Sequence, residues 1–385
     1  MLRETQNALK VKRRKRIWKL KNLNKRVIIA AGGTGGHIFP ALAIANALKK
    51  KEPDMDILFV GAKGKMEMEK VPEAGYSIEG IDIAGYNRSS LLKNFALPYK
   101  LVKSFLQVKN IFKTFKPQAA IGVGGYSSFP VLRYAQAKGI PTFIHESNSY
   151  AGKSNMLLGK KATRIFTASD GMEKFFPPDR LLQTGNPVRK NVVTNQISRE
   201  EGVAFFGLDP QYTTVLVTGG SLGAKSMNEA IDSGIPLLIK NQIQLIWQTG
   251  KSFAAQAAVH AAESKMIWTG EFISKMEYAY AAADIVVSRS GSVLYELCAV
   301  KKPVIFVPYP HAAEDHQTVN AENLVKKNAA IMISDKDARN KMVPEILALA
   351  KNKMEQEILK NNIGKLAVTD ADEIIANEIL KILND

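Results

Sequence analysis

Short aliphatic runs alternate with helical patterns along nearly the whole chain, and several of the runs end in glycine clusters. Five runs lie in the first half, at 27–31, 57–60, 119–123, 142–145 and 164–167. Five more follow a Gly-Asn-Pro stretch, at 214–218, 243–247, 266–269, 284–288 and 303–307. Strands that alternate with helices of this kind predict parallel βαβ units. Because the strand–helix pattern starts again after the Gly-Asn-Pro stretch, we predict two doubly wound α/β domains with a linker at 185–194.

The first glycine cluster, at 31–37, follows a strand and opens a helix. Glycines there let the backbone approach a ligand, while the N–H groups of the helix face an anion. The cluster is no dinucleotide fingerprint, because Ile38 stands where its last glycine belongs, and no Gly-Lys-Ser triplet completes a Walker A loop. Similar turns follow strands at 124–127 and 219–223. Together they predict a phosphorylated ligand in a cleft between the two domains.

Three polar side chains stand where that cleft is expected. His37 begins the first helix and is either a general base or a structural histidine. Glu296 follows a strand of the second half, where a carboxylate can accept hydrogen bonds from ribose hydroxyls. Gln317 lies at the start of the next helix. No cluster of acids or histidines has metal-ligand spacing, and the single cysteine, Cys298, excludes a disulfide framework and a Cys-based zinc site. We therefore expect no bound metal, and we expect no cofactor.

The net charge of +17 is concentrated in two segments. Residues 1–26 hold eleven Lys and Arg against one acid, which suits an anionic membrane surface, nucleic acid or a merely solvated tail. Residues 91–116 hold six lysines and no acid, with apolar residues at helical spacing. That segment is either a core-facing helix or a membrane-surface helix. Nucleic-acid binding is not expected, since no known signature follows the tail. No run is long enough for a transmembrane helix.

These features together resemble the MurG family of glycosyltransferases, which add N-acetylglucosamine to lipid I in peptidoglycan synthesis. The resemblance runs from about residue 26 to the C-terminus. Six motifs carry it: GGTGGHIFPALAIANAL at 32–48, GVGGYSSFP at 122–130, HESNSYAGKSN at 145–155, GNPVR at 185–189, GGSLGAKSMN at 219–228 and AEDHQTVNAENL at 313–324. The wording of the last is similar to the Bacteroidetes branch.

The resemblance implies a GT-B fold, in which two Rossmann-like doubly wound parallel-sheet domains face a central cleft. We expect 26–188 to form the domain for lipid I and the membrane and 189–368 to bind UDP-GlcNAc. A C-terminal helix at 369–385 is expected to pack back on the first domain, and the basic extension 1–25 lies outside the resemblance. The implied location is the cytoplasmic face of the inner membrane.

The implied reaction is an inverting transfer without a protein-bound metal. The muramyl 4-hydroxyl attacks the anomeric carbon of UDP-GlcNAc and gives lipid II. Alternatives within the fold are a diacylglycerol glycosyltransferase and a UDP-sugar epimerase. A non-catalytic nucleotide-sugar-binding regulator is the alternative outside enzymes.

On the donor side, the resemblance assigns five residues. Arg189 and Ser221 serve the diphosphate, and the backbone of Ile273 reads uracil. Glu296 holds the ribose, and Gln317 holds the hydroxyls of N-acetylglucosamine.

In the first domain, the resemblance places His37 as base or acceptor-positioning group. Thr34, Gly35 and Gly36 line the sugar and phosphate end of the donor, and Asn148 lies near the acceptor side and the donor sugar.

The chain departs from the family pattern at three places. Phe129 replaces a glycine of the second loop, and Ser147 replaces the glutamine of an E-Q-N triplet. The segment 289–296 is one residue shorter than usual, which turns a helical side chain by about 100°. Glu296 keeps its expected role because the triplet that it begins, Glu-Leu-Cys at 296–298, still matches the family pattern.

Overall fold

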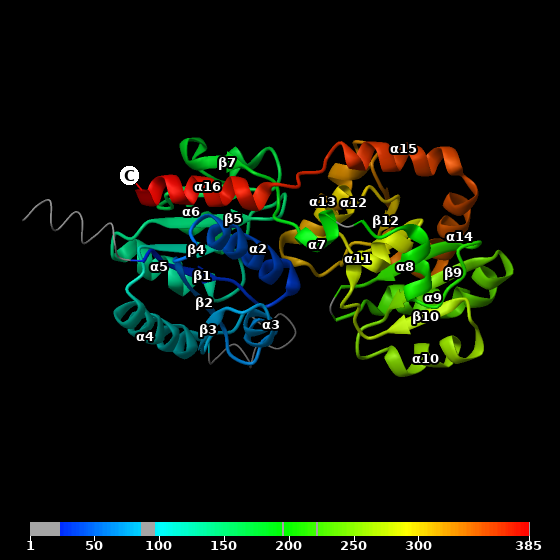
Figure 1. Ribbon diagram of the computed structural model, residues 1–385, viewed down its shortest axis with the longest axis horizontal. Coiled ribbons are helices and arrows are strands. Elements are labelled where there is room, and N and C mark those ends of the chain that lie inside the picture. The colour runs from blue at the N-terminus through cyan, green and yellow to red at the C-terminus, as the bar shows by residue number, and fades with distance from the viewer. Residues whose placement is uncertain (1–23, 86–96, 195, 221, 385) are drawn as a thin grey trace, which may run out of the picture.

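The computed structural model describes residues 24–85, 97–194, 196–220 and 222–384. These residues form two parallel β-sheets, one of seven strands and one of six, and each sheet is covered by helices on both faces (Figure 1). The strand orders are β3-β2-β1-β4-β5-β6-β7 and β10-β9-β8-β11-β12-β13. In both sheets the first strand lies inside and the chain winds outward in both directions. The predicted fold of two doubly wound Rossmann-like domains is confirmed.

The strands of the first sheet are β1 (Arg26–Ala30), β2 (Asp56–Ala62), β3 (Ser77–Ile81), β4 (Ala119–Gly122), β5 (Thr142–Glu146), β6 (Arg164–Thr167) and β7 (Leu181–Gln183). Its helices are α2 (Gly35–Lys51), α3 (Glu67–Glu73), α4 (Leu97–Phe115), α5 (Ser128–Ala137) and α6 (Lys153–Gly159), and two 3₁₀ turns, η2 (Met172–Lys174) and η3 (Pro178–Arg180), precede β7. The inner strands read as aliphatic runs because both of their faces are buried.

The strands of the second sheet are β8 (Thr213–Thr218), β9 (Ile243–Gln248), β10 (Ile267–Gly270), β11 (Ile285–Ser288), β12 (Val304–Phe306) and β13 (Ile331–Met332). Its helices are α7 (Lys190–Val193), α8 (Arg199–Phe205), α9 (Lys225–Lys240), α10 (Ala254–Glu263), α11 (Met276–Ala282), α12 (Val293–Val300), α13 (His316–Val325), α14 (Ala338–Lys351) and α15 (Lys353–Gly364), with the 3₁₀ turns η4 (Ala313–Asp315) and η5 (Asp335–Asp337). Apolar clusters fill both faces of this sheet as well.

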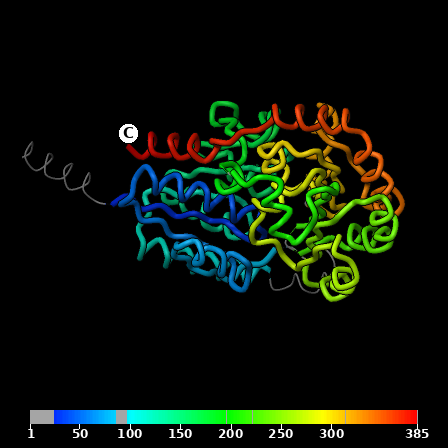
Figure 2. The backbone as a smooth tube through the Cα atoms, turned by 45° about the vertical axis from the view of Figure 1, so that its right-hand side comes forward, coloured from blue at the N-terminus to red at the C-terminus, as the bar shows by residue number. Residues whose placement is uncertain are grey.

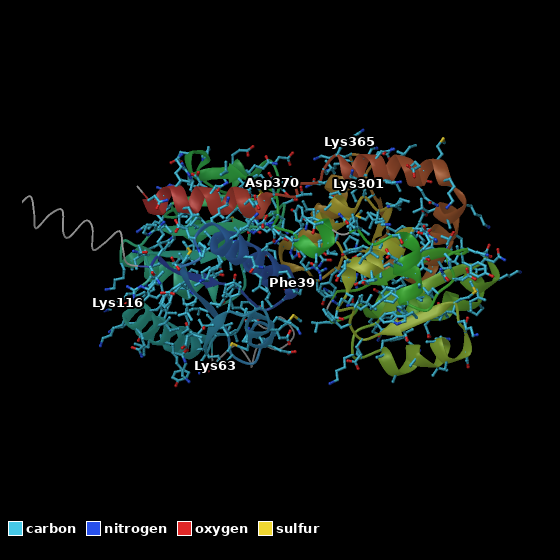
Figure 3. The ribbon with its side chains drawn as sticks, viewed as in Figure 1. Phe39, Lys63, Lys116, Lys301, Lys365 and Asp370 are labelled. Atoms are coloured by element: carbon cyan, nitrogen blue, oxygen red, sulfur yellow. The ribbon has the colours of Figure 1, made fainter. Side chains whose placement is uncertain are left out.

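The last helix, α16 (Ala371–Asn384), crosses back from the second domain to the first. Figure 2 shows this red segment alongside the blue N-terminal one, and Figure 3 labels Lys365 and Asp370 on either side of the crossing. Ile375 and Ile379 are fully buried in the same apolar cluster as residues of α2 and β1. Arg164 on β6 also pairs with Glu378, with 2.9 Å between Nε and Oε1. The first domain is therefore completed by the end of the chain.

All strand pairs in both sheets are parallel, so the carboxyl ends of each sheet lie at one edge. Hydrogen bonds from the loop after β5 to α12 and α13 place both edges at the region between the domains. The loops after β1, β4 and β5 and those after β11 and β12 consequently meet there. Among the described residues, no helix combines the length and the apolar character needed to span a bilayer.

Candidate active site

Two glycine turns of the first domain interlock at the ends of β1 and β4. Gly125 has a φ of +84°, and a Cβ atom there would lie 2.3 Å from the carbonyl oxygen of Gly32. Gly124 has a φ of +99°, and its Cβ would lie 2.4 Å from Cδ2 of His37. A side chain at either position would collide with the first turn, so both positions need glycine for conformation and for space.

His37 is the third residue of α2 and is half-buried. Its Nδ1 lies 3.0 Å from the carbonyl oxygen of Gly32. A carbonyl oxygen only accepts, so the neutral ring carries its proton on Nδ1 and leaves a lone pair on Nε2. Burial lowers the pKa of His37, although the bond to Gly32 and the charges of Glu146 and Glu67 oppose that effect. The imidazole is consequently neutral near pH 7 and can accept a proton at Nε2.

Glu146, the last residue of β5, organises the loop that carries Asn148. Its Oε1 accepts from the backbone N–H and the side-chain amide of Asn148, at 3.0 and 3.1 Å. Its Oε2 accepts from the N–H of Gly152 and the amide of Asn155, at 3.0 and 2.9 Å. A single buried carboxylate therefore fixes the loop that contains Asn148.

Arg189 and Glu296 are bonded to each other in two places. Nε and an Nη of Arg189 donate to the two carboxylate oxygens of Glu296, at 2.6 and 2.7 Å. The buried hydroxyl of Tyr280 donates to the same carboxylate at 2.9 Å. Burial disfavours the charge of Arg189, but the Glu296 carboxylate outweighs it and raises the pKa of Arg189. Sequence reasoning assigned the two residues to different parts of the donor and did not foresee this pair.

The pair also reaches the first domain. The guanidinium carbon of Arg189 lies 5.1 Å from the ring centroid of Phe39 on α2, within cation–π range. Figure 3 labels Phe39 at the side of the first domain that faces the second. The short segment 289–296 thus leaves Glu296 at the junction of the two domains.

Other predicted residues lie around the same junction. A Cβ on Gly36 would lie 2.7 Å from Oγ of Ser292, so the first glycine turn closely approaches the N-terminus of α12. The side-chain oxygen of Gln317 accepts from the backbone N–H of Tyr309 at 2.9 Å. Thr34 precedes α2 and is exposed. Ser221 falls outside the described residues.

Ile273 was expected to act through its backbone, and its side chain is indeed not available to a ligand. Its side chain is buried in the core of the second domain, beside the end of β10. Within the described part of the chain, no hydrogen bond involves its N–H or C=O. A peptide group of this kind can read the edge of a base.

Hydrogen bonds between the domains involve two residues that sequence reasoning missed. The hydroxyl of Tyr295 donates to the carbonyl oxygen of Ser147 at 2.6 Å. The side-chain oxygen of Asn320 accepts from the N–H of Ser149 at 3.1 Å, while its amide donates to the carbonyl oxygen of Ser290. These bonds join the loop after β5 to the first turn of α12 and the middle of α13.

Comparison with known proteins covers almost the whole described chain. Residues 27–167 match the N-terminal domain model of glycosyltransferase family 28, and 214–375 match its C-terminal domain model. The UDP-N-acetylglucosamine–N-acetylmuramyl-(pentapeptide) pyrophosphoryl-undecaprenol N-acetylglucosamine transferase of Phocaeicola vulgatus is 50% identical over 93% of this chain and 96% of its own. The transferase of the same name from Bacteroides fragilis is 50% identical over 93% and 95%.

A solved structure agrees with these relatives. The crystal structure of MurG from Acinetobacter baumannii superposes with a TM-score of 0.68 at 27% identity, and the match covers 93% of this chain and 99% of that one. Sequence and structure therefore point to the same group of proteins.

Proposed function

This chain belongs to glycosyltransferase family 28, and we propose that it forms lipid II. It transfers N-acetylglucosamine from UDP-GlcNAc to the muramyl sugar of undecaprenyl-pyrophosphoryl-MurNAc-pentapeptide, a step of peptidoglycan synthesis. The observation that carries the proposal is 50% identity, over nearly the full length, to transferases named for this reaction.

For the chemical step, we propose His37 as the group that accepts the proton. The muramyl 4-hydroxyl attacks the anomeric carbon of the donor, the bond from that carbon to the diphosphate oxygen breaks, and UDP leaves. The hydroxyl proton passes to Nε2 of His37. Support comes from the bond at Nδ1, which leaves Nε2 free to accept, and from the burial that keeps the ring neutral.

For the donor, we propose a site divided between uracil, ribose, diphosphate and sugar. The backbone of Ile273 reads uracil, Glu296 accepts from the ribose hydroxyls, and Arg189 and Ser221 bind the diphosphate. Gln317 holds the sugar hydroxyls. The closeness of Arg189 to Glu296 supports this division, because ribose and diphosphate are adjacent in the donor.

We propose that the first domain binds the acceptor, with Asn148 beside it. In the same domain, Thr34, Gly35 and Gly36 line the sugar and phosphate end of the donor. The close approach of Gly36 to Ser292 supports a reaction centre shared by the two domains.

We propose that the enzyme works as a peripheral protein at the cytoplasmic face of the membrane. The outer side of α4 exposes Tyr99 by 68%, Val102 by 63% and Leu106 by 58%. The exposed Lys100 and Lys109 lie on the same helix. An apolar face rimmed by cations suits an anionic bilayer surface, where the polyprenyl chain of the acceptor resides.

The test is a turnover assay with a soluble lipid I analogue. UDP-GlcNAc should support transfer and UDP-galactose should not. His37→Ala should lower kcat by about 10²- to 10⁴-fold, the usual contribution of a positioned base, with little change in UDP affinity. Transfer from UDP-galactose, or sugar epimerisation without acceptor, would overturn the assigned reaction. A fall in kcat of less than about tenfold would make His37 a structural residue.

A further inference from the structure

Glu67, the first residue of α3, is a buried carboxylate directed at the first glycine turn. Its Oε2 accepts from the N–H of Gly33 and its Oε1 from the N–H of Ala62, both at 2.9 Å. Among the described residues no ion pair includes Glu67. A buried charge requires strong hydrogen bonds, and here two backbone N–H groups supply them.

The N–H of Gly33 and the C=O of Gly32 belong to one peptide group. The described peptide bonds are all trans, so these two groups lie in the plane of the peptide and point in opposite directions. The carboxylate of Glu67 accepts on one side, and the Nδ1–H of His37 donates on the other. Hydrogen bonds in such a chain polarise one another, so the carboxylate makes the Gly32 oxygen a stronger acceptor.

The linking peptide is held in place from both sides. A Cβ on Gly32 would lie only 2.0 Å from Oε1 of Glu67, so the carboxylate packs directly against the turn. On the other side, Gly125 closely approaches the same peptide. The peptide therefore has little freedom to rotate away from either partner.

We propose that Glu67 is a positioning residue for His37 and acts on it through the Gly32–Gly33 peptide. The carboxylate, the peptide and the imidazole form a relay in which the peptide takes the place of a direct carboxylate–histidine contact. The relay fixes the Nδ1–H tautomer, orients Nε2 and strengthens it as a base. This inference rests on the proposed role of His37.

Other charged and titratable groups face His37 and stay unchanged in the test. Glu146 and His145 lie on β5, and His316 begins α13. Glu146 raises the pKa of His37, whereas His316 lowers it. Glu67 raises it, so removing this charge alone should lower the pKa further.

The test compares Glu67→Gln with Glu69→Gln, which removes a carboxylate that is 71% exposed on the same helix. Glu67→Gln should lower kcat about tenfold, the size of one charge-assisted hydrogen bond, and leave UDP affinity unchanged. The acidic limb of the pH profile of kcat should move to lower pH, because a weaker base is protonated only at lower pH. Glu69→Gln should change neither quantity.

Two further readouts separate this relay from a role in shaping the turn. In a His37→Ala background Glu67→Gln should cost nothing more, and a further tenfold loss there would overturn the proposal. NMR titration of imidazole ¹⁵N signals should show a lower pKa for His37 in Glu67→Gln, and an unchanged pKa would also overturn it. This titration needs no turnover, so it still tests the relay if His37 is not the base.

The wild-type protein provides a measurement that does not depend on the variant folding. The ¹⁵N shifts of neutral His37 should be those of the Nδ1–H tautomer. An Nε2–H tautomer would break the relay at its last bond and overturn the proposal.

Discussion

At the scale of single residues, the pair of Arg189 and Glu296 joins the two side chains that we propose for the diphosphate and the ribose. A bidentate arginine–carboxylate pair fixes the orientation of both side chains. The hydroxyl of Tyr280 restrains the carboxylate further. A donor that uses both residues must share these bonds or replace them, so its ribose and diphosphate are recognised together rather than independently.

We predict that Glu296→Ala weakens UDP binding by roughly 10- to 150-fold. The loss corresponds to ~1.5–3 kcal/mol for a charge-assisted hydrogen bond, at about 1.4 kcal/mol per tenfold change. Calorimetry with UDP measures it, and Glu357→Ala, an exposed carboxylate on α15, is the control. Unchanged affinity in Glu296→Ala would assign the ribose to another group.

The sequence identified site residues only where a strand passes directly into a loop or helix. His37 and Glu296 could be chosen because parallel strands bring such junctions to one edge. Glu67, Tyr295 and Asn320 could not, because each takes its role from a residue far along the chain. Their partners Gly33, Ser147 and Ser149 are 34, 148 and 171 positions away. Periodicity carries no information about contacts of that kind.

At the scale of elements, the inner strands were predictable, whereas among the edge strands only β10 was expected, from the run at 266–269. The aliphatic runs at 27–31 and 214–218 overlap β1 and β8, which are buried on both faces. Edge strands β3 and β13 are only partly buried, and β13 has two residues, so neither leaves an aliphatic run. Tertiary pairing rather than local pattern defines such strands.

Helix α4 has one side in the core and exposed apolar residues on the other, and its membrane role stays a prediction. Val108 and Phe112, two of the apolar residues at helical spacing in 91–116, are buried, which meets the expectation of a core-facing helix. Leu101, another of these residues, is 38% exposed, and Tyr99, Val102 and Leu106 face outward. Phe95 and most of the basic extension 1–25 fall outside the described residues. The outward side of α4 is therefore the described surface on which the membrane proposal can be tested.

We predict that replacing Tyr99, Val102 and Leu106 together with Ser weakens binding to anionic vesicles at both low and high salt. Apolar insertion contributes ~25 cal/mol per Å² and is not screened, unlike the charge attraction of lysines. Co-sedimentation at roughly 50 and 500 mM salt measures it, because the Debye length falls from about 14 to 4 Å over that range.

The matched control for α4 replaces Leu237 and Val259, exposed apolar residues of the second domain, with Ser. These variants should bind vesicles like the wild type. A loss confined to low salt in the α4 variant would mean that its apolar face does not enter the bilayer.

At the scale of the whole molecule, α16 ties the two domains into a single unit. We predict that Ile375→Ala with Ile379→Ala destabilises the first domain, since each buried large-to-small change costs ~2–5 kcal/mol. Hydrogen exchange of α2 should accelerate, while the unfolding of the second domain, reported by the buried Trp247, should change little. Asn377→Ala on the exposed side is the control. Unchanged exchange in α2 would mean that α16 contributes no stability there.

The return of α16 also has a consequence for biosynthesis. A ribosome adds about 5–20 residues per second, so the roughly 200 residues after the first sheet take about 10–40 s. During that interval the nascent first domain lacks the helix that covers the apolar face of α2. Its folding is thus completed only after the second domain has been made, and until then chaperones have a hydrophobic surface to protect.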